Sequence, residues 1–344
     1  MCGIHNLLPV VTKYFKANIH THSTITDGKL SPLELKELYK KRGYQILAIT
    51  DHNVVVDHSA LNEDGFLMLT GAEFGVSEPG QTALYKKSYH LNCISKRPDN
   101  NWQPIMPRKP RESAIPYLAR VESPDILRSH SPESINEIIG ICNEHDYLVM
   151  YNHPVWSLHN YTDYAPLKGL WAMEICNYNC LYSGRDTYSS MVYRDFLELG
   201  NRLFPVCCDD MHTVKTHAGA WIMVGAETLN YDSVITALEK GDFYASTGPE
   251  IYSLTAEGNQ LKITCSDASS IALESDCRFA KRMIPAQGEE FLQEATFDLT
   301  KWIEGTKEND LSEKAYIRLT VYGPQGHRAC TRAYFFDELF KNAL

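Results

Sequence analysis

Residues 46–53 read Ile-Leu-Ala-Ile-Thr-Asp-His-Asn, an apolar run that passes directly into an acid and an imidazole. The run from Gln45 to Thr50 predicts a buried strand, because it is short, continuous and rich in aliphatic residues. A helix start precedes it, with Ser31 as N-cap, Pro32 in the first turn and Glu34 placed to complete a capping box. This segment therefore predicts a helix followed by a buried strand that ends in polar side chains.

The same alternation of elements continues to about residue 245. Ser131-Pro132 opens a second helix with an apolar face of helical period. Further buried strands are expected over residues 66–72, 148–152 and 203–208. Strands that alternate with helices indicate a mostly parallel sheet, and polar residues gathered at strand ends favour a closed or nearly closed barrel. The predicted fold class is thus α/β.

The residues after Gly248-Pro249 have a different character. Short β-rich segments separated by turn residues follow, without a convincing helical pattern until the last few positions. They predict a small C-terminal antiparallel β-sandwich. The expected organisation is an N-terminal extension over residues 1–12, the barrel over 13–249 and the sandwich over 250–344.

Side chains that bind transition metals follow many of these predicted strands. His20 and His22 are two residues apart, so in an extended chain both point to the same side and can share one ion. Asp51 is expected to orient its neighbour His52 or to act as a further ligand. Imidazole and carboxylate hold zinc, manganese and iron, so a dispersed set of this kind predicts a multinuclear centre assembled by folding. The candidate ligands are His20, His22, Asp27, His52, Glu73, His90, His153, Asp210 and His212, of which His90 alone begins an apolar run.

Several motifs resemble, in the same order along the chain, those of the PHP (polymerase and histidinol phosphatase) domain family and its metal-dependent phosphoesterase branch. The resemblance covers about residues 13–249 and is specific, because separate motifs agree in order. Residues 242–249 are also similar to the segment that closes the domain in some bacterial members. The other motifs are Ile-His-Thr-His-Ser (19–23), Asp-Gly (27–28), Ala-Ile-Thr-Asp-His-Asn (48–53), Gly-Ala-Glu (71–73), Asn-His-Pro (152–154) and Asp-Asp-Met-His (209–212).

The resemblance implies a distorted (β/α)7 barrel that holds two or three divalent ions of zinc, manganese or iron. Some trinuclear members have His at the position of Asp27, which is instead reminiscent of PHP phosphoesterases that act on nucleotides or short RNA ends. The implied ligands are His20, His22, Glu73 and Asp210 for one ion, the shared Glu73 with His90 and His153 for a second, and Asp27, His52 and His212 for a third.

The expected function is hydrolysis of a small phosphomonoester: a nucleotide, an RNA end, a sugar phosphate or an amino-acid phosphate. A hydroxide that bridges two ions would attack the phosphorus, since coordination lowers the pKa of water to about 7. The expected catalytic residues are Glu73, Asp210 and His212. Residues 83–132 hold nine Lys or Arg against four acids and predict a phosphate clamp. The candidates for substrate binding are Arg111, Arg120, Arg128, Arg185 and His217.

Two other functions fit the same residues. A metallohydrolase of a carboxylic ester or amide would use a metal-activated water equally well. A non-catalytic, metal-stabilised binding module would leave recognition to the β-rich part of the chain, although fold alone warrants no function. Phosphate inhibition and a phosphate-dependent substrate profile would separate the first alternative from phosphoester hydrolysis. Unchanged hydrolysis after Glu73→Ala would favour the second.

Composition bears on which partners the protein binds and on where in the cell it is expected. A formal net charge of −10 argues against general nucleic-acid binding, but it permits a local basic patch and a nucleotide or short RNA substrate. No stretch approaches the roughly 20 apolar residues of a membrane span. The ten cysteines show no paired spacing and no signal peptide is visible, so the expected location is the cytoplasm.

Overall fold

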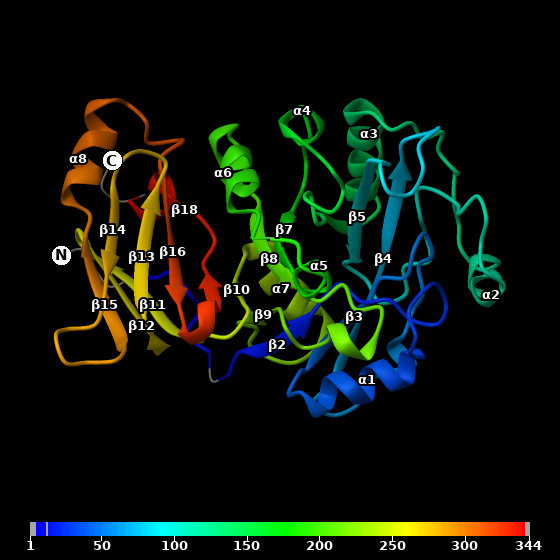
Figure 1. The fold of residues 1–344 in the computed structure, drawn as a ribbon, viewed down its shortest axis with the longest axis horizontal. Coiled ribbons are helices and arrows are strands. Elements are labelled where there is room, and N and C mark those ends of the chain that lie inside the picture. The colour runs from blue at the N-terminus through cyan, green and yellow to red at the C-terminus, as the bar shows by residue number, and fades with distance from the viewer. Residues whose placement is uncertain (1–4, 12, 187, 341–344) are drawn as a thin grey trace.

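The computed structural model describes residues 5–11, 13–186 and 188–340, and its central feature is one long mixed β-sheet (Figure 1). The strands predicted around residues 45–50, 66–72, 148–152 and 203–208 are all present. In spatial order, the part of the sheet nearest the predicted ligands runs β10 (Phe243–Ser246), β9 (Trp221–Val224), β2 (Phe15–Asn18), β3 (Ile46–Ile49), β4 (Leu67–Ser77), β5 (Ser88–Ser95), β6 (Tyr147–Tyr151), β7 (Ala172–Asn177) and β8 (Phe204–Cys208).

The strands of this part run in both directions. The pairs β2–β3, β3–β4, β6–β7 and β7–β8 are parallel, as expected. β5 is antiparallel to both of its neighbours. The beginning of β5 therefore lies at the same edge of the sheet as the carboxyl ends of the parallel strands. This reversal explains why His90 lies near the start of an apolar run while most other candidate ligands lie at or after the end of one.

The two helices predicted from capping signals are confirmed. α1 (Pro32–Lys41) begins with a capping box, in which Ser31 Oγ accepts from Glu34 N at 3.3 Å and Glu34 Oε2 accepts from Ser31 N at 2.8 Å. α3 (Pro132–Glu144) begins at the N-cap Ser131. The other helices of this part are α2 (Ile115–Leu118), α4 (Tyr161–Tyr164), α5 (Tyr178–Tyr182), α6 (Ser190–Glu198) and α7 (Tyr231–Lys240), with the 3-10 turns η1 (Ser59–Leu61), η2 (Glu112–Ala114) and η3 (Val214–Thr216).

The expected closed or nearly closed barrel is not confirmed, because the sheet does not close. Within the described residues, no strand ladder joins β8 to β2 or β9, so the sheet stays open. Its two sides meet beyond the strand ends, where Asp210 N donates to His20 O at 2.9 Å and His22 N donates to Met211 O at 3.0 Å. A parallel bridge between Thr21 and Met211 lies between these bonds. The antiparallel strands β5, β9 and β10 interrupt the regular strand–helix repeats, so the distorted (β/α)7 barrel that the resemblance implies is not confirmed.

The C-terminal third adds strands to this sheet and forms a second one. β17 (Arg328–Cys330) pairs with β10, so the long sheet continues across the predicted boundary at 249/250. Its further strands are β13 (Ser270–Ser275), β14 (Ala280–Met283), β16 (Tyr316–Tyr322) and β18 (Tyr334–Phe335). The second sheet has the order β1 (His5–Asn6), β11 (Ile251–Glu257), β12 (Gln260–Ala268) and β15 (Leu292–Asp298). Two helices, α8 (Thr300–Glu308) and α9 (Phe336–Leu339), and the turn η4 (Pro324–Gly326) complete this part.

Both sheets of the C-terminal third share one hydrophobic core. It includes Leu254 and Ile263 from the second sheet, Leu273 and Leu319 from the long sheet, and Trp302 from α8. A separate β-sandwich over residues 250–344 stays a prediction, because one of the two layers is an extension of the long sheet. The domain boundaries also stay predictions, and residues 1–4 and 12 of the expected N-terminal extension lie outside the described residues.

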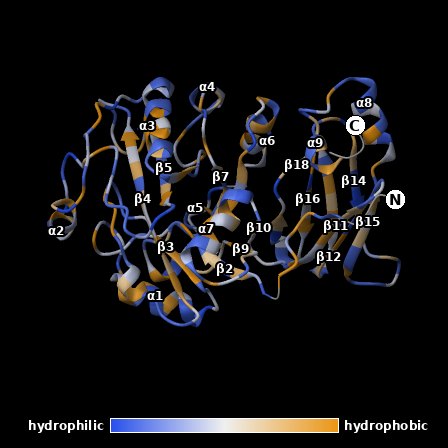
Figure 2. Ribbon diagram, turned by 180° about the vertical axis from the view of Figure 1, so that it is seen from behind, coloured by the Kyte–Doolittle hydropathy of each residue, from blue (hydrophilic) through white to orange (hydrophobic). Residues whose placement is uncertain are grey.

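Burial follows the hydrophobic pattern of the sequence. All residues of β3, β6 and β7 are buried, and Figure 2 shows mainly hydrophobic colours along many of the strands, with more mixed colours on the loops and helices. A strand that is covered on both faces is expected to be apolar throughout. Glu174 in β7 breaks this rule, since it is an acid that is 1% exposed. None of the described helices combines the length and the apolar character that a bilayer crossing requires.

Candidate metal centre

The structure brings all nine predicted ligands together at one edge of the sheet. They form four overlapping groups, and within each group one potential ligand atom per residue lies within 4.8 Å of the others. His20 and His22 follow β2, His52 follows β3, and His153 follows β6. The loop after β8 carries the last two ligands. The four groups are His22–Asp27–His52–His212, His20–His22–Glu73, His20–His153–Asp210 and His52–Glu73–His90.

Two of these ligands have unusual backbone geometry. His153 has φ of 24° and Asp210 has φ of 52°, in the left-handed region that residues other than glycine rarely adopt. Such conformations cost about 1–3 kcal/mol each and persist where the surrounding structure holds them. Here hydrogen bonds from His153 N to Glu174 and from Asp210 N to His20 O hold them. The turns redirect both side chains immediately after their strands end.

Glu73 lies at the centre of the cluster, and its two carboxylate oxygens face different imidazoles. A carboxylate in this arrangement is suited to bridging two cations. The Asn152 amide also donates to Oε1 at 2.8 Å, which fixes the orientation of the carboxylate. Oε1 lies 3.0 Å from His90 Nδ1, 3.2 Å from His153 Nε2 and 3.3 Å from His20 Nε2, whereas Oε2 lies 3.0 Å from His52 Nδ1 and 3.4 Å from His22 Nε2.

Asp210 completes the most buried group. Its Oδ1 lies 3.2 Å from His20 Nε2 and 3.1 Å from His22 Nε2. Both imidazoles therefore point the same nitrogen at Asp210 and at Glu73. Two imidazoles and two carboxylates around one space form a donor set that suits a transition-metal ion.

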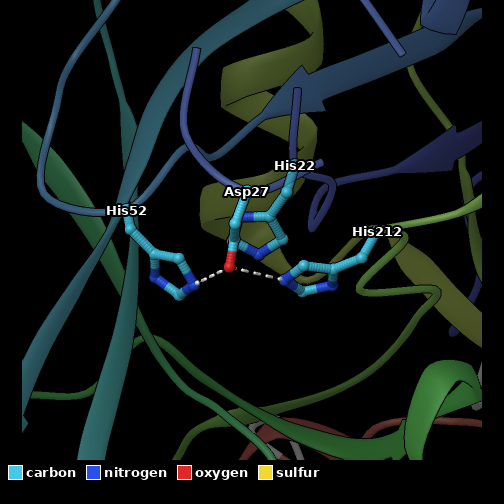
Figure 3. Close-up of side chains that lie close together, drawn as sticks. All are labelled: His22, Asp27, His52 and His212. Atoms are coloured by element: carbon cyan, nitrogen blue, oxygen red, sulfur yellow. Dashed lines mark ion pairs between the residues drawn. The ribbon is translucent and has the colours of Figure 1, made fainter. Parts of the chain in front are cut away.

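Asp27 forms a more open group with three imidazoles. One of its oxygens lies 3.4 Å from both His52 Nε2 and His212 Nε2, as the dashed lines in Figure 3 show. Its other oxygen lies 3.7 Å from His22 Nδ1. The side chains of Asp27, His52 and His212 are 31%, 26% and 25% exposed, so this group faces the solvent. It is the part of the centre that a substrate can reach.

Unpartnered buried atoms test whether these residues fit a metal. His20 Nε2, both ring nitrogens of His22, Glu73 Oε2 and Asp210 Oδ1 are buried and have no hydrogen-bond partner among the described residues. Buried polar atoms are normally satisfied, because leaving one without a partner costs free energy. All five atoms point into the groups described above. Divalent cations bound in these groups would supply the partners that the five atoms lack.

The electrostatics keep the carboxylates ionised. Burial alone would raise the pKa of Glu73, but the surrounding imidazoles of His90, His20 and His52 lower it well below its ordinary value. Asp210 behaves in the same way, with His20 and His22 lowering its pKa against the effect of burial. Burial, together with repulsion from His52, lowers the pKa of His22 to about 4, so this imidazole is neutral. Against the effect of burial, the neighbouring carboxylates raise the pKa of His20, His52, His153 and His212, so metal binding would displace protons from these imidazoles.

The most informative residue that the sequence analysis missed is Glu174. Its carboxylate lies 3.0 Å from His20 Nδ1 and accepts from His153 N at 2.9 Å. A partner on Nδ1 orients the ring and leaves Nε2 free to bind a metal. Ser157 Oγ plays the same part for His153 Nδ1, at 3.2 Å. A lone acid inside the apolar run of residues 172–177 was the available signal for Glu174.

Two neighbouring acids hold the ligand loops in place. Asp51 was expected to orient a ligand or to act as one, and its hydrogen bonds go to the loop between His22 and Asp27. It accepts from Ser23 N at 2.9 Å and from Ser23 Oγ at 2.6 Å. Asp209 accepts from the backbone N–H groups of residues 218–220 and so fixes the loop after His212; burial raises its pKa to about 6.

The predicted substrate-binding residues lie in different surroundings. Arg128 lines a cavity together with Asn53, which follows the ligand His52. Arg120 lines a different cavity with Asp57 and Asp99. Arg42 Nε donates to His217 Nε2 at 3.1 Å. Arg111 and Arg185 are exposed. In the described part of the chain no hydrogen bond or ion pair joins these five residues to the nine ligands, so their roles stay predictions.

The chain was compared with protein-family models and with known sequences. No family model matches the chain. A 5'-3' exoribonuclease from Haemophilus influenzae is 36% identical over 70 residues, which are 19% of this chain and 26% of that protein. The match thus spans about a quarter of that relative's length.

Two solved structures are also similar to the chain. One is a two-domain protein from Bacteroides vulgatus, described as containing a predicted PHP-like metal-dependent phosphoesterase, with a TM-score of 0.44, 14% identity, and coverage of 96% of this chain and 98% of that one. The other is an amidohydrolase from Chromobacterium violaceum with bound sulfate and no metal, with a TM-score of 0.41, 16% identity, and coverage of 66% and 96%.

Proposed function

We propose that the chain is a metal-dependent phosphoesterase of the PHP type that hydrolyses a small phosphomonoester. The observation that carries this proposal is the position of Glu73, whose two oxygens face separate sets of imidazoles inside a pocket of unpartnered ligand atoms. A purely structural ion needs only a closed set of four ligands. Nine candidate ligands that include a carboxylate placed to bridge two ions, with one group open to solvent, suit catalysis better.

The chain's residues divide into holding and reacting groups. His20, His22, Glu73, His153 and Asp210 are buried and would hold the ions. When bound, divalent ions supply an activated water and neutralise the charge of the phosphoryl oxygens. His52 and His212, with Asp27, form the exposed face against which the phosphoryl group would be placed. If this third group binds no ion, His212 Nε2 is free to donate a proton to the leaving oxygen.

The proposal is tested by elemental analysis of the purified protein, followed by a phosphatase screen with added manganese. We expect at least two divalent ions per chain and hydrolysis of one or more phosphomonoesters, with inhibition by inorganic phosphate. Carboxylic esters and amides in the same screen should remain intact. Hydrolysis of those substrates without any of the phosphate esters would contradict the proposal, and so would metal-replete protein that hydrolyses none of them.

A further inference from the structure

A cavity of about 500 Å³ lies directly beside the metal centre. Asn53 in its wall follows the ligand His52, and Gly75 in its wall touches the ligand His90, since a Cβ atom at Gly75 would lie 3.4 Å from His90 Nε2. The remaining wall comes from the end of β4 and the following residues 78–79, from Lys86, and from the segments 107–109 and 128–130. A substrate that reaches the centre on this side can therefore extend into the cavity.

The cavity is basic although the protein is acidic. Four cationic side chains line it, Lys86, Arg108, Lys109 and Arg128, against the single carboxylate of Glu78. Burial, together with repulsion from Arg108, lowers the pKa of Arg128. Cations are thus gathered in the wall with too few carboxylates to balance them. A concave surface of one charge sign attracts a ligand of the opposite sign.

Two buried nitrogen atoms in the cavity wall have no partner among the described residues. Arg128 Nη2 donates to Met106 O at 2.6 Å, which fixes the guanidinium, while Nη1 is buried and has no hydrogen-bond partner among the described residues. His130 Nε2 is also buried and lacks a partner in the described structure. An unsatisfied guanidinium donor beside several cations indicates a missing anion.

We propose that this cavity binds a second phosphoryl group of the substrate, separate from the phosphate that is hydrolysed at the metal centre. The inference rests on the proposed function, and it names the substrate class as a small molecule with two phosphoryl groups. A phosphoryl group suits the wall because its oxygens can accept from a fixed guanidinium and from several other cations together. The cavity is also larger than one phosphate requires, which leaves room for the linking atoms.

Substrate length provides the first test. The metal-loaded protein is assayed with alkane-α,ω-diyl bisphosphates of three to eight carbons and with the monophosphates of the same alcohols. We expect kcat/KM to favour one bisphosphate length over its monophosphate by roughly tenfold or more, since charge-assisted hydrogen bonds to the second group are strong. Arg128→Gln and Arg108→Gln should lower this ratio about tenfold. Equal kcat/KM for bisphosphates and monophosphates at every length would overturn the subsite.

Arg97→Gln is the matched control for these variants. Arg97 belongs to the same basic segment, but it is 56% exposed, pairs with Asp146 at 3.2 Å and does not line the cavity. The bisphosphate preference should therefore be the same in Arg97→Gln as in the unchanged protein. A loss of preference in Arg97→Gln as large as in Arg128→Gln would contradict a local subsite. Thermal unfolding of each variant shows whether it folds.

A binding measurement decides the subsite independently of hydrolysis. Calorimetric titration of the metal-loaded protein with inorganic phosphate should show two binding events, one at the metal centre and one in the cavity. Arg128→Gln should lose one event and retain the other. The same stoichiometry in both proteins would reject the subsite even if phosphatase activity is found. Loss of one binding event in Arg128→Gln would support the subsite even if no phosphate ester in the screen is hydrolysed. The absence of hydrolysis would contradict the proposed function and not the subsite.

Discussion

Glu73 is the side chain on which the metal centre depends, because five imidazoles lie within 3.4 Å of its oxygens. Its place at the end of an apolar run made it predictable as a candidate ligand. Glu174 was harder to predict, since it lies inside a strand and acts through His20. Ligands that follow strands can be predicted from the local sequence. Residues that orient those ligands cannot, because their role depends on contacts between strands.

Glu73→Gln keeps the size of the side chain but removes its charge. We expect the variant to bind at least one ion fewer per chain and to hydrolyse phosphate esters at least about 100-fold more slowly, since a bridging carboxylate holds both ions. Elemental analysis and initial rates measure the two effects. Glu137→Gln, on the exposed face of α3, is the control and should match the unchanged protein. Full metal content and full activity in Glu73→Gln would refute the bridging role.

Glu174→Gln tests a positioning residue. The amide can still contact His20, but it no longer offers a charged acceptor to Nδ1, so the apparent metal affinity should fall by about 10–100-fold. Excess metal should restore most of the rate, which separates positioning from direct catalysis. Titration with manganese at fixed substrate measures both quantities. An unchanged metal affinity would show that the contact at 3.0 Å has no part in holding the ring.

At the scale of elements, the capped helix α1 and the buried strands followed from local signals, but the direction of β5 did not. Nothing in residues 88–95 distinguishes a parallel from an antiparallel strand, because pairing partners lie elsewhere in the chain. The reversed direction of β5 is what brings His90 to the ligand edge. The open sheet was missed for the same reason, since closure depends on how residues 20–22 meet 210–211.

The loop from Ser23 to Gly28 has no room for a larger side chain at its last residue. A Cβ atom at Gly28 would lie 2.0 Å from His22 O, a backbone atom that cannot move away. Gly28→Ala should therefore lower the free energy of unfolding by about 1–3 kcal/mol, as overpacking does elsewhere, and weaken the group around Asp27. Chemical denaturation measures the first effect and metal content the second.

Gly140→Ala is the matched control for that substitution. Gly140 lies in α3 with nothing within 4 Å of the added Cβ, so alanine should raise the free energy of unfolding by up to about 1 kcal/mol. Equal effects of the two substitutions would show that the loop can relax around Gly28.

At the scale of the whole molecule, the N-terminal part and the C-terminal third are joined by one continuous sheet through the β10–β17 pair. The sequence predicted strand-rich character after residue 249, because turn residues and short apolar runs are local. It did not predict that the long sheet continues through this region, since strand pairing is non-local. The metal centre lies in the N-terminal part, far along the sheet order from β14.

Metal removal should affect the stability of the whole molecule. Buried ligand atoms of Glu73 and Asp210 would lose their cation partners, so chelation should lower the free energy of unfolding. A ligand that binds only the folded state raises the free energy of unfolding by about 2.7 kcal/mol per site when its free concentration is 100 times its Kd. Thermal unfolding before and after chelator treatment measures the change, and added manganese should reverse it. Identical Tm values with and without metal would argue against bound ions.

The most direct test of the central claim is anomalous X-ray diffraction from a crystal of the manganese-loaded protein. We predict two peaks about 3.5–4 Å apart, one within bonding distance of each Glu73 oxygen, with His20, His22, His90 and His153 as neighbours. Absence of any peak beside Glu73, or a single peak bound by only one of its oxygens, would contradict the account.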